Sequence, residues 1–153
     1  MKFYFDMDGT IVDLYGVPGW LEKLQASDPS PYVKAKPLIN LSLFARYINK
    51  LQKQGHEIHI ITCLSKDSTP AYDQDVTRAK YTWLRQHLPS VAFNSIIVLP
   101  YGANKGESIV DNGEECRLFD DEINNRRQWR KAITNGFAHL PCSIFTILQM
   151  EAA

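Results

Sequence analysis

Short apolar segments alternate along this chain with longer segments in which apolar residues recur at helical spacing. The short segments are rich in aromatic and β-branched residues, as strands are. They predict strands over Lys2–Met7, Glu57–Thr62, Ser95–Leu99 and Cys116–Phe119, and Phe137–Leu140 fits a fifth. The periodic segments predict helices over Pro37–Gln54, Gln74–Leu88 and Glu122–Asn135. The tail, Ser143–Met150, is compatible with either a strand or a helix.

Proline and glycine mark where these helices begin and end. Pro37 suits a first helical turn, and Pro89 closes the second helix. Gly55 and Gly136 stand just after the first and third helices, where a residue often takes a left-handed backbone conformation.

Strands that alternate with helices imply a parallel sheet that is covered by helices on both faces. We therefore expect an α/β fold, a Rossmann-like three-layer sandwich with a central parallel sheet. The length of 153 residues fits a single domain, residues 1–153. Residues 14–36 hold several Gly and Pro residues around a short helical stretch at Trp20–Ala26, and we expect them to form a small cap insertion after the first strand.

Composition narrows the range of partners and compartments. Lys and Arg number 17, as do Asp and Glu, so the formal net charge is zero, which argues against nucleic acid as a partner. No apolar run is long enough to span a membrane, and the N-terminus lacks the features of a secretory signal. Cys63, Cys116 and Cys142 have neither disulfide nor zinc-site spacing. We expect them to be buried thiols in a cytoplasmic protein.

Chemically active residues follow the predicted strands. Asp6 and Asp8 follow the first strand, Thr62 ends the second, and Asp120 and Asp121 follow the fourth. In parallel α/β sheets, ligands bind beyond the carboxyl ends of the strands. The positions of these residues and the predicted sheet therefore support each other.

The segment D-M-D-G-T at Asp6–Thr10 resembles the first motif of the haloacid dehalogenase superfamily of phosphotransferases. Three further motifs of that superfamily have counterparts in the same order along the chain: H-I-I-T ending at Thr62, Lys105 before a short helix, and L-F-D-D-E at Leu118–Glu122. Within the superfamily, Lys80–Pro89 and Asp120–Gly136 are similar to segments of the 5'(3')-deoxyribonucleotidase group. That group has a larger helical cap than residues 14–36 can form.

The resemblance implies a role for each matched residue. Asp6 would be the nucleophile, and Asp8 would protonate the leaving oxygen and then deprotonate the attacking water. Mg²⁺ would screen these acids from the phosphate. Its metal site would comprise the side chains of Asp6 and Asp120, the Asp8 carbonyl, and Asp121 as an alternative ligand. Asp121 also suits the N-cap of the following helix.

Thr62 and Lys105 would bind the phosphate, with Lys80 as the rival for the role of Lys105. The resemblance thus implies a Mg²⁺-dependent phosphatase, a hydrolase whose substrate is a small phosphomonoester, with a nucleoside monophosphate preferred. Trp20 and Tyr32 in the insertion either contact a base or pack the insertion down.

Two alternatives stay open at the level of the sequence. The phosphatase could act on a sugar phosphate or a nucleic-acid end, because a small cap leaves the site open. The other alternative is a non-catalytic module that binds Mg²⁺ and phosphate, although the intact Asp6 and Asp8 speak against it. The sequence leaves the oligomeric state open, including closure of the site by a neighbouring subunit.

Overall fold

A five-stranded parallel sheet forms the centre of the computed structural model, which describes residues 1–153. The strand order is β5-β4-β1-β6-β7, and every neighbouring pair is parallel. The strands are β1 Lys2–Phe5, β4 Glu57–Cys63, β5 Ser95–Leu99, β6 Cys116–Phe119 and β7 Gly136–His139. A separate antiparallel pair consists of β2 Val12–Asp13 and β3 Lys36–Pro37.

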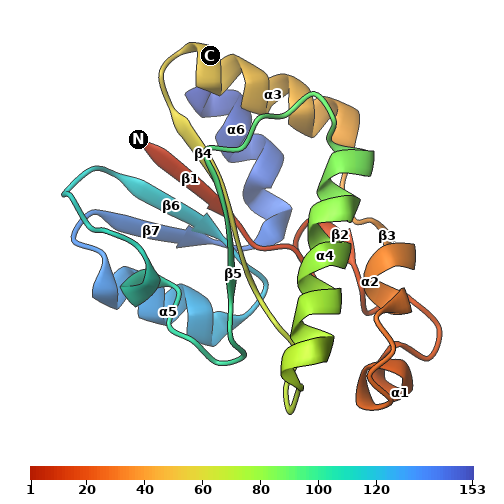
Figure 1. The fold of residues 1–153 in the computed structure, drawn as a ribbon. Helices are drawn as coiled ribbons and strands as arrows, with labels where there is room; N and C mark the ends of the chain where they lie inside the picture. The colour runs from red at the N-terminus through yellow and green to blue at the C-terminus, as the bar shows by residue number, and fades with distance from the viewer.

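Helices cover both faces of the sheet, which confirms the predicted α/β fold (Figure 1). The helices are α1 Trp20–Gln25, α2 Ser30–Lys34, α3 Leu41–Lys53, α4 Pro70–His87, α5 Ile123–Ala132 and α6 Ile144–Glu151. Two short 3₁₀ helices, Gly106–Ser108 and Pro141–Ser143, complete the chain. None of the helices combines the length and the apolar character needed to cross a membrane.

The alternation of side chains along β1 divides the core into two layers. Phe3 and Phe5 are fully buried in a cluster with residues of α3, α4 and α6. Tyr4 faces the opposite side, where it packs with Trp129 of α5 and with apolar residues of β6 and β7. The sheet is therefore buried on both faces, as a parallel sheet requires.

Several predicted helix boundaries were wrong, because polar caps start these helices. Pro37 does not lie in a first helical turn but pairs in β3, and α3 begins later, where Asn40 accepts a hydrogen bond from the Leu43 N–H at 3.0 Å. By contrast, α4 begins earlier than predicted, at Pro70, because Thr69 caps it in the same way.

The ends of the other segments also bear on the predictions. Gly136 does not follow a helix end: α5 ends at Ala132 and Gly136 begins β7. The prediction for Gly55 is confirmed, since it has a positive φ of 89° just beyond α3. The ambiguous tail forms α6. Of the cysteines, only Cys116 is buried; Cys63 is half-buried, and Cys142 is exposed because it lies in a surface 3₁₀ turn.

Residues 14–36 form α1 and α2 between the strands of the small antiparallel pair. The helical stretch at Trp20–Ala26 was predicted, whereas α2 was not. Tyr32 of α2 packs with Tyr72, Val76 and Ala79 of α4. This insertion therefore rests on α4, at the carboxyl end of the sheet (Figure 1).

Candidate active site

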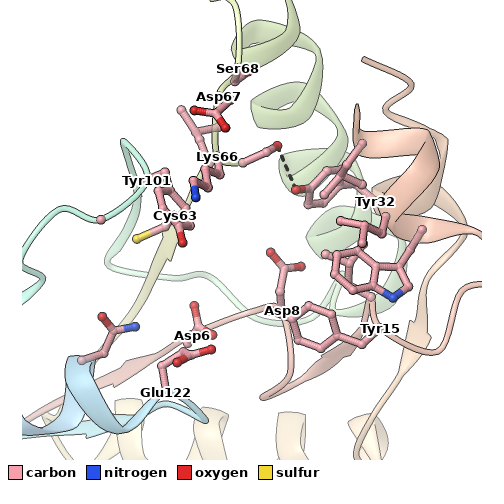
Figure 2. Close-up of a pocket in the computed structure, with 18 of the residues that line it drawn as sticks. Asp6, Asp8, Tyr15, Tyr32, Cys63, Lys66, Asp67, Ser68, Tyr101 and Glu122 are labelled. Atoms are coloured by element: carbon pink, nitrogen blue, oxygen red, sulfur yellow. Dashed lines mark hydrogen bonds between the residues drawn. The ribbon is translucent and has the colours of Figure 1, made fainter. Parts of the chain in front are cut away.

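The residues singled out in the sequence meet at the carboxyl edge of the sheet. Asp6 and Asp8 extend from β1, Thr62 from β4, and Asp120 and Asp121 from β6, while Lys105 precedes the first 3₁₀ helix. Asp6 and Asp8 both line a single cavity, into which Figure 2 shows them projecting. The three central strands of the sheet thus deliver their terminal polar side chains to one place.

A tight turn after β1 sets the directions of the first two acids. The backbone N–H groups of Thr10, Ile11 and Val12 all donate to the carbonyl oxygen of Met7. Gly9 has a positive φ of 81°, and a Cβ there would lie 2.3 Å from an Asp121 carboxylate oxygen. The glycine of D-M-D-G-T is therefore needed both for the turn and for the close approach of Asp121.

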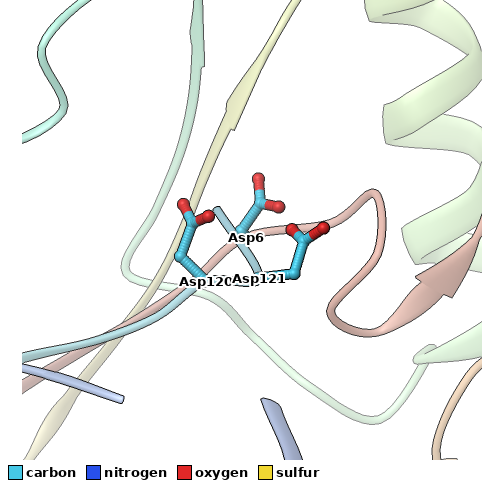
Figure 3. A group of neighbouring side chains, drawn as sticks. All are labelled: Asp6, Asp120 and Asp121. Atoms are coloured by element: carbon cyan, nitrogen blue, oxygen red, sulfur yellow. The ribbon is translucent and has the colours of Figure 1, made fainter. Parts of the chain in front are cut away.

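Three carboxylates form what we call the acid trio: Asp6, Asp120 and Asp121 (Figure 3). One oxygen of each lies within 4.8 Å of the others. The carboxylate of Asp120 is fully buried and accepts hydrogen bonds from the Glu122 N–H at 2.9 Å and the Asn125 amide at 3.1 and 3.2 Å. These contacts hold Asp120 rigidly beside Asp6.

The acid trio carries more negative charge than its surroundings neutralise. Burial raises the pKa of Asp121 to about 7, and the negative charges of Asp6 and Asp120 are the next largest causes of this shift. Burial and Asp6 also raise the pKa of Asp120. Asp121 Oδ1 is buried without a hydrogen-bond partner, and the N-cap of α5 is Glu122 rather than Asp121. Clustered carboxylate oxygens with an unpaired buried acceptor suit a hard divalent cation such as Mg²⁺.

Lys105 lies against this trio and is almost fully buried. Its ammonium nitrogen is 2.8 Å from Asp6 Oδ1 and 2.6 Å from Asp120 Oδ2. Burial works against the charged form, but Asp6 and Asp120 outweigh it and raise the pKa of Lys105. Lys105 is therefore a fixed positive charge beside the first acid of the turn.

Lys80 of α4 provides a second buried positive charge on the other side of the turn. Its ammonium nitrogen lies 2.6 Å from Asp8 Oδ2 and 2.9 Å from Thr62 Oγ1, and 5.0 Å from the centre of the Tyr32 ring. Lys80 and Lys105 are each 1% exposed. From the sequence, either lysine could have been the one that binds the phosphate. The structure places the Lys80 ammonium against Asp8 and the Lys105 ammonium against Asp6.

The structure also adds two residues that sequence reasoning did not assign to the site. Asn125 binds the Asp120 carboxylate, and Arg126 donates from Nη1 to the carbonyl oxygens of Asp120 at 2.8 Å and Asp121 at 2.7 Å. Both lie in the first turn of α5, which begins at Ile123. This turn follows shortly after Asp120 and Asp121, which we call the acid pair. Asn125 lies in the segment Asp120–Gly136, whose similarity to the deoxyribonucleotidase group was the available signal for it.

The cavity above the acids has a volume of about 850 Å³ and is larger than one phosphate group. Tyr15 and Trp20 form one wall and meet edge to face with ring centres 5.0 Å apart. Tyr101, which is 61% exposed, lines another part (Figure 2). Tyr32 is 4% exposed and its hydroxyl bonds to Ser65, so it packs the insertion down instead of offering an open ring face.

No protein-family model and no curated protein sequence matches the chain. The solved structures that are similar to it include two D,D-heptose 1,7-bisphosphate phosphatases. The first, from Burkholderia thailandensis, is 13% identical with a TM-score of 0.51, and the match covers 90% of each chain. The second, from B. bronchiseptica in complex with magnesium and phosphate, is 15% identical with a TM-score of 0.53, and the match covers 89% of this chain and 79% of that one. This likeness shows that the chain shares their fold.

Proposed function

We propose that this protein is a Mg²⁺-dependent phosphomonoester hydrolase of the haloacid dehalogenase type. The observation that carries the proposal is the meeting of the acid trio, Lys105 and Thr62 at one end of the sheet, beneath an open cavity. A cluster of acids alone is common. Here it is combined with buried lysines and with the glycine turn that aims Asp6 and Asp8 into the cavity. The phosphatase activity named for both similar structures supports the proposal.

Mg²⁺ would be held by the Asp6 and Asp120 side chains and the Asp8 carbonyl, with Asp121 as a further ligand. When bound, it would offset the negative charge of these acids and polarise the phosphoryl group as a Lewis acid. The amide of Asn125 and the guanidinium of Arg126 keep the acid pair in place for this purpose. Lys105 adds a positive charge on the same side as Asp6 and stabilises the phosphoryl oxygens.

In the first chemical step, a carboxylate oxygen of Asp6 forms a bond to phosphorus, and the bond from phosphorus to the leaving oxygen breaks. Asp8 gives its proton to that oxygen, so the alcohol leaves neutral. In the second step a water attacks phosphorus, Asp8 takes a proton from the water, and Asp6 is released with inorganic phosphate. Lys80 holds the Asp8 carboxylate toward the cavity, where the leaving group stands.

For the substrate we favour a nucleoside monophosphate. The cavity has room for a ring system beyond the phosphate, and Tyr15, Trp20 and Tyr101 give it aromatic walls. Stacking of a base on an aromatic ring contributes ~1–3 kcal/mol. Residues 14–36 act in this proposal as a small cap that supplies part of that wall.

The test of the activity is turnover of p-nitrophenyl phosphate by the Asp6→Asn variant, with and without Mg²⁺. Loss of a covalent nucleophile is expected to lower turnover by several powers of ten. Asp13→Asn is the matched control, because Asp13 bonds the Gly16 N–H outside the cavity and should leave turnover within a few-fold. If Asp6→Asn keeps more than about a tenth of the turnover, Asp6 is not the nucleophile.

A panel of substrates tests the preference separately. The panel comprises nucleoside monophosphates, sugar phosphates and a 5'-phosphorylated oligonucleotide. We expect the nucleoside monophosphates to have the highest kcat/KM. A ten-fold advantage of a sugar phosphate or of the oligonucleotide, ~1.4 kcal/mol, would overturn the nucleotide assignment and leave the phosphatase assignment intact. Binding of phosphate and Mg²⁺ without any turnover would instead indicate a binding module.

A further inference from the structure

A second hollow lies at the carboxyl end of the edge strand β7, outside the candidate active site. Its volume is about 570 Å³, and it is bordered by α5, the end of β7 and the start of α6. No residue lines both hollows. The stripe of α5 that faces the active-site cavity contains Asn124, Asn125 and Gln128, whereas Arg126, Arg127 and Arg130 face the second hollow.

The second hollow concentrates positive charge on a chain whose formal net charge is zero. The three arginines line it, and no Asp or Glu does. None of them forms an ion pair with a side chain, unlike Arg117, which pairs with Glu115 and Glu151. A guanidinium has five N–H donors. Arg126 and Arg130 use donors of one terminal nitrogen each on backbone carbonyls, so most of their donors stay free.

One further polar group at the same hollow lacks a partner. His139 lines it, and its Nε2 is buried without a hydrogen bond. Ser143 also lines it and does not cap α6 with its side chain, because its hydroxyl donates to the Leu140 carbonyl at 2.7 Å. The N–H of Ile144, the first residue of α6, is also taken, because it donates to the Pro141 carbonyl. Three arginines and an imidazole nitrogen without a partner thus border one space.

We propose that this hollow is a second, non-catalytic anion site that binds a phosphate group, either free or on a small organic molecule. Several unpaired guanidinium groups in one hollow match the charge and the multiple acceptor oxygens of phosphate. Arg126 also joins this site to the acid pair, because it holds the carbonyl oxygens of Asp120 and Asp121. The proposal does not depend on phosphatase activity.

The test measures binding of inorganic phosphate to the full chain in metal-free buffer of low ionic strength. Metal is removed with a chelating resin, since a soluble chelator is itself an anion that competes for arginines. Without metal, the acid trio repels phosphate from the catalytic cavity. Calorimetry gives the affinity, and backbone amide NMR shifts locate the site, with the largest changes expected at 123–130 and 139–144.

Arg127→Gln is the informative variant, because Arg127 is exposed and its side chain makes no hydrogen bond in the structure. We expect it to weaken phosphate binding about ten-fold, the loss of one charge-assisted contact. Arg78→Gln, on the exposed face of α4, is the control and should stay within about two-fold. Turnover of p-nitrophenyl phosphate with Mg²⁺ should be unchanged in Arg127→Gln, so this test is independent of the one on Asp6.

A nucleoside monophosphate serves as the second probe. If it binds more tightly than inorganic phosphate and loses affinity in Arg127→Gln, the site takes an organic phosphate; equal affinities assign it to the free anion. No saturable phosphate binding up to about 10 mM would overturn the proposal. So would binding that Arg127→Gln leaves unchanged, or NMR shifts confined to the residues around Asp6 and Lys105.

Discussion

Replacing Lys105 by methionine is expected to change Mg²⁺ affinity and turnover in opposite directions. The Lys105 ammonium lies 2.8 Å from Asp6 Oδ1 and 2.6 Å from Asp120 Oδ2, the two side chains proposed to hold Mg²⁺. It would therefore repel a cation at the same oxygens, although in the proposed mechanism it favours an incoming phosphate. Methionine keeps the length of the buried chain and removes the charge, so the variant should bind Mg²⁺ more tightly and turn over more slowly.

The size of the effect follows from charge and distance. Because the Lys105 ammonium contacts two carboxylates proposed to hold Mg²⁺, we take about 4 Å as an order-of-magnitude separation of the two cations. A divalent and a univalent charge at that distance repel by ~2 kcal/mol in water and by ~8 kcal/mol at an effective dielectric constant near 20. Because the cavity opens to solvent, we take the lower figure, and the affinity for Mg²⁺ should rise at least ten-fold.

The assay is calorimetric titration of metal-free protein with Mg²⁺, with turnover of p-nitrophenyl phosphate measured at saturating metal. Lys53→Met is the control, because Lys53 is exposed at the end of α3 and should change neither quantity. Thermal unfolding with and without Mg²⁺ adds an independent readout, since a tighter ligand raises the melting temperature more. Weaker Mg²⁺ binding in Lys105→Met would refute the placement of the cation on the acid trio.

Three further changes test other contacts of the site and the core. Lys80→Met should destabilise the fold by about 3–5 kcal/mol in chemical denaturation, and should lower kcat more than it raises KM, because it strands the Asp8 carboxylate. Gly9→Ala should weaken Mg²⁺ binding in calorimetry, since its Cβ would lie 2.3 Å from an acid-trio oxygen. Gly113→Ala is the control, because Gly113 also has a positive φ but has open space around it, so this variant should lower the stability of the fold without changing Mg²⁺ binding. Burial lowers the pKa of His59 in the folded protein. The melting temperature should therefore be highest above about pH 6.5 and should fall as the pH drops from there through the lower pKa of the folded state. The variant His59→Gln should show a smaller decline.

The sheet was predictable because its central strands are buried on both faces, and all of its longer strands appear as short apolar segments. Ser95–Leu99 and Cys116–Phe119 have the predicted bounds. Helix starts were less predictable, because they depend on which polar residue turns its side chain back to the chain. The side chains of Asn40 and Thr69 do so. Proline and glycine are weaker markers of helix ends, because both also occur in strands and turns. Gly136, for example, begins a strand.

The acids of the candidate site were predictable for a topological reason. In a parallel sheet, residues that follow different strands arrive at the same edge, so Asp6, Thr62 and Asp120 could be brought together without knowledge of the packing. The partner of each lysine could not be predicted. Lys80 reaches Asp8 only because α4 brings it beside Thr62 near the end of β4, and Arg126 reaches the acid pair only through the orientation of α5.

The insertion is where sequence reasoning was weakest, and the structure suggests how so short a segment can shape a cavity. It is fastened to the body by side-chain hydrogen bonds: the Tyr32 hydroxyl to Ser65 at 3.1 Å, the Tyr72 hydroxyl to the Asp28 carbonyl at 3.1 Å, and the Trp83 indole to the Ala35 carbonyl at 2.8 Å. A segment tied at several points does not need to close over a ligand to define the wall. Selectivity would then arise from fixed side chains such as Tyr15, and substrate should enter without a large rearrangement of the cap.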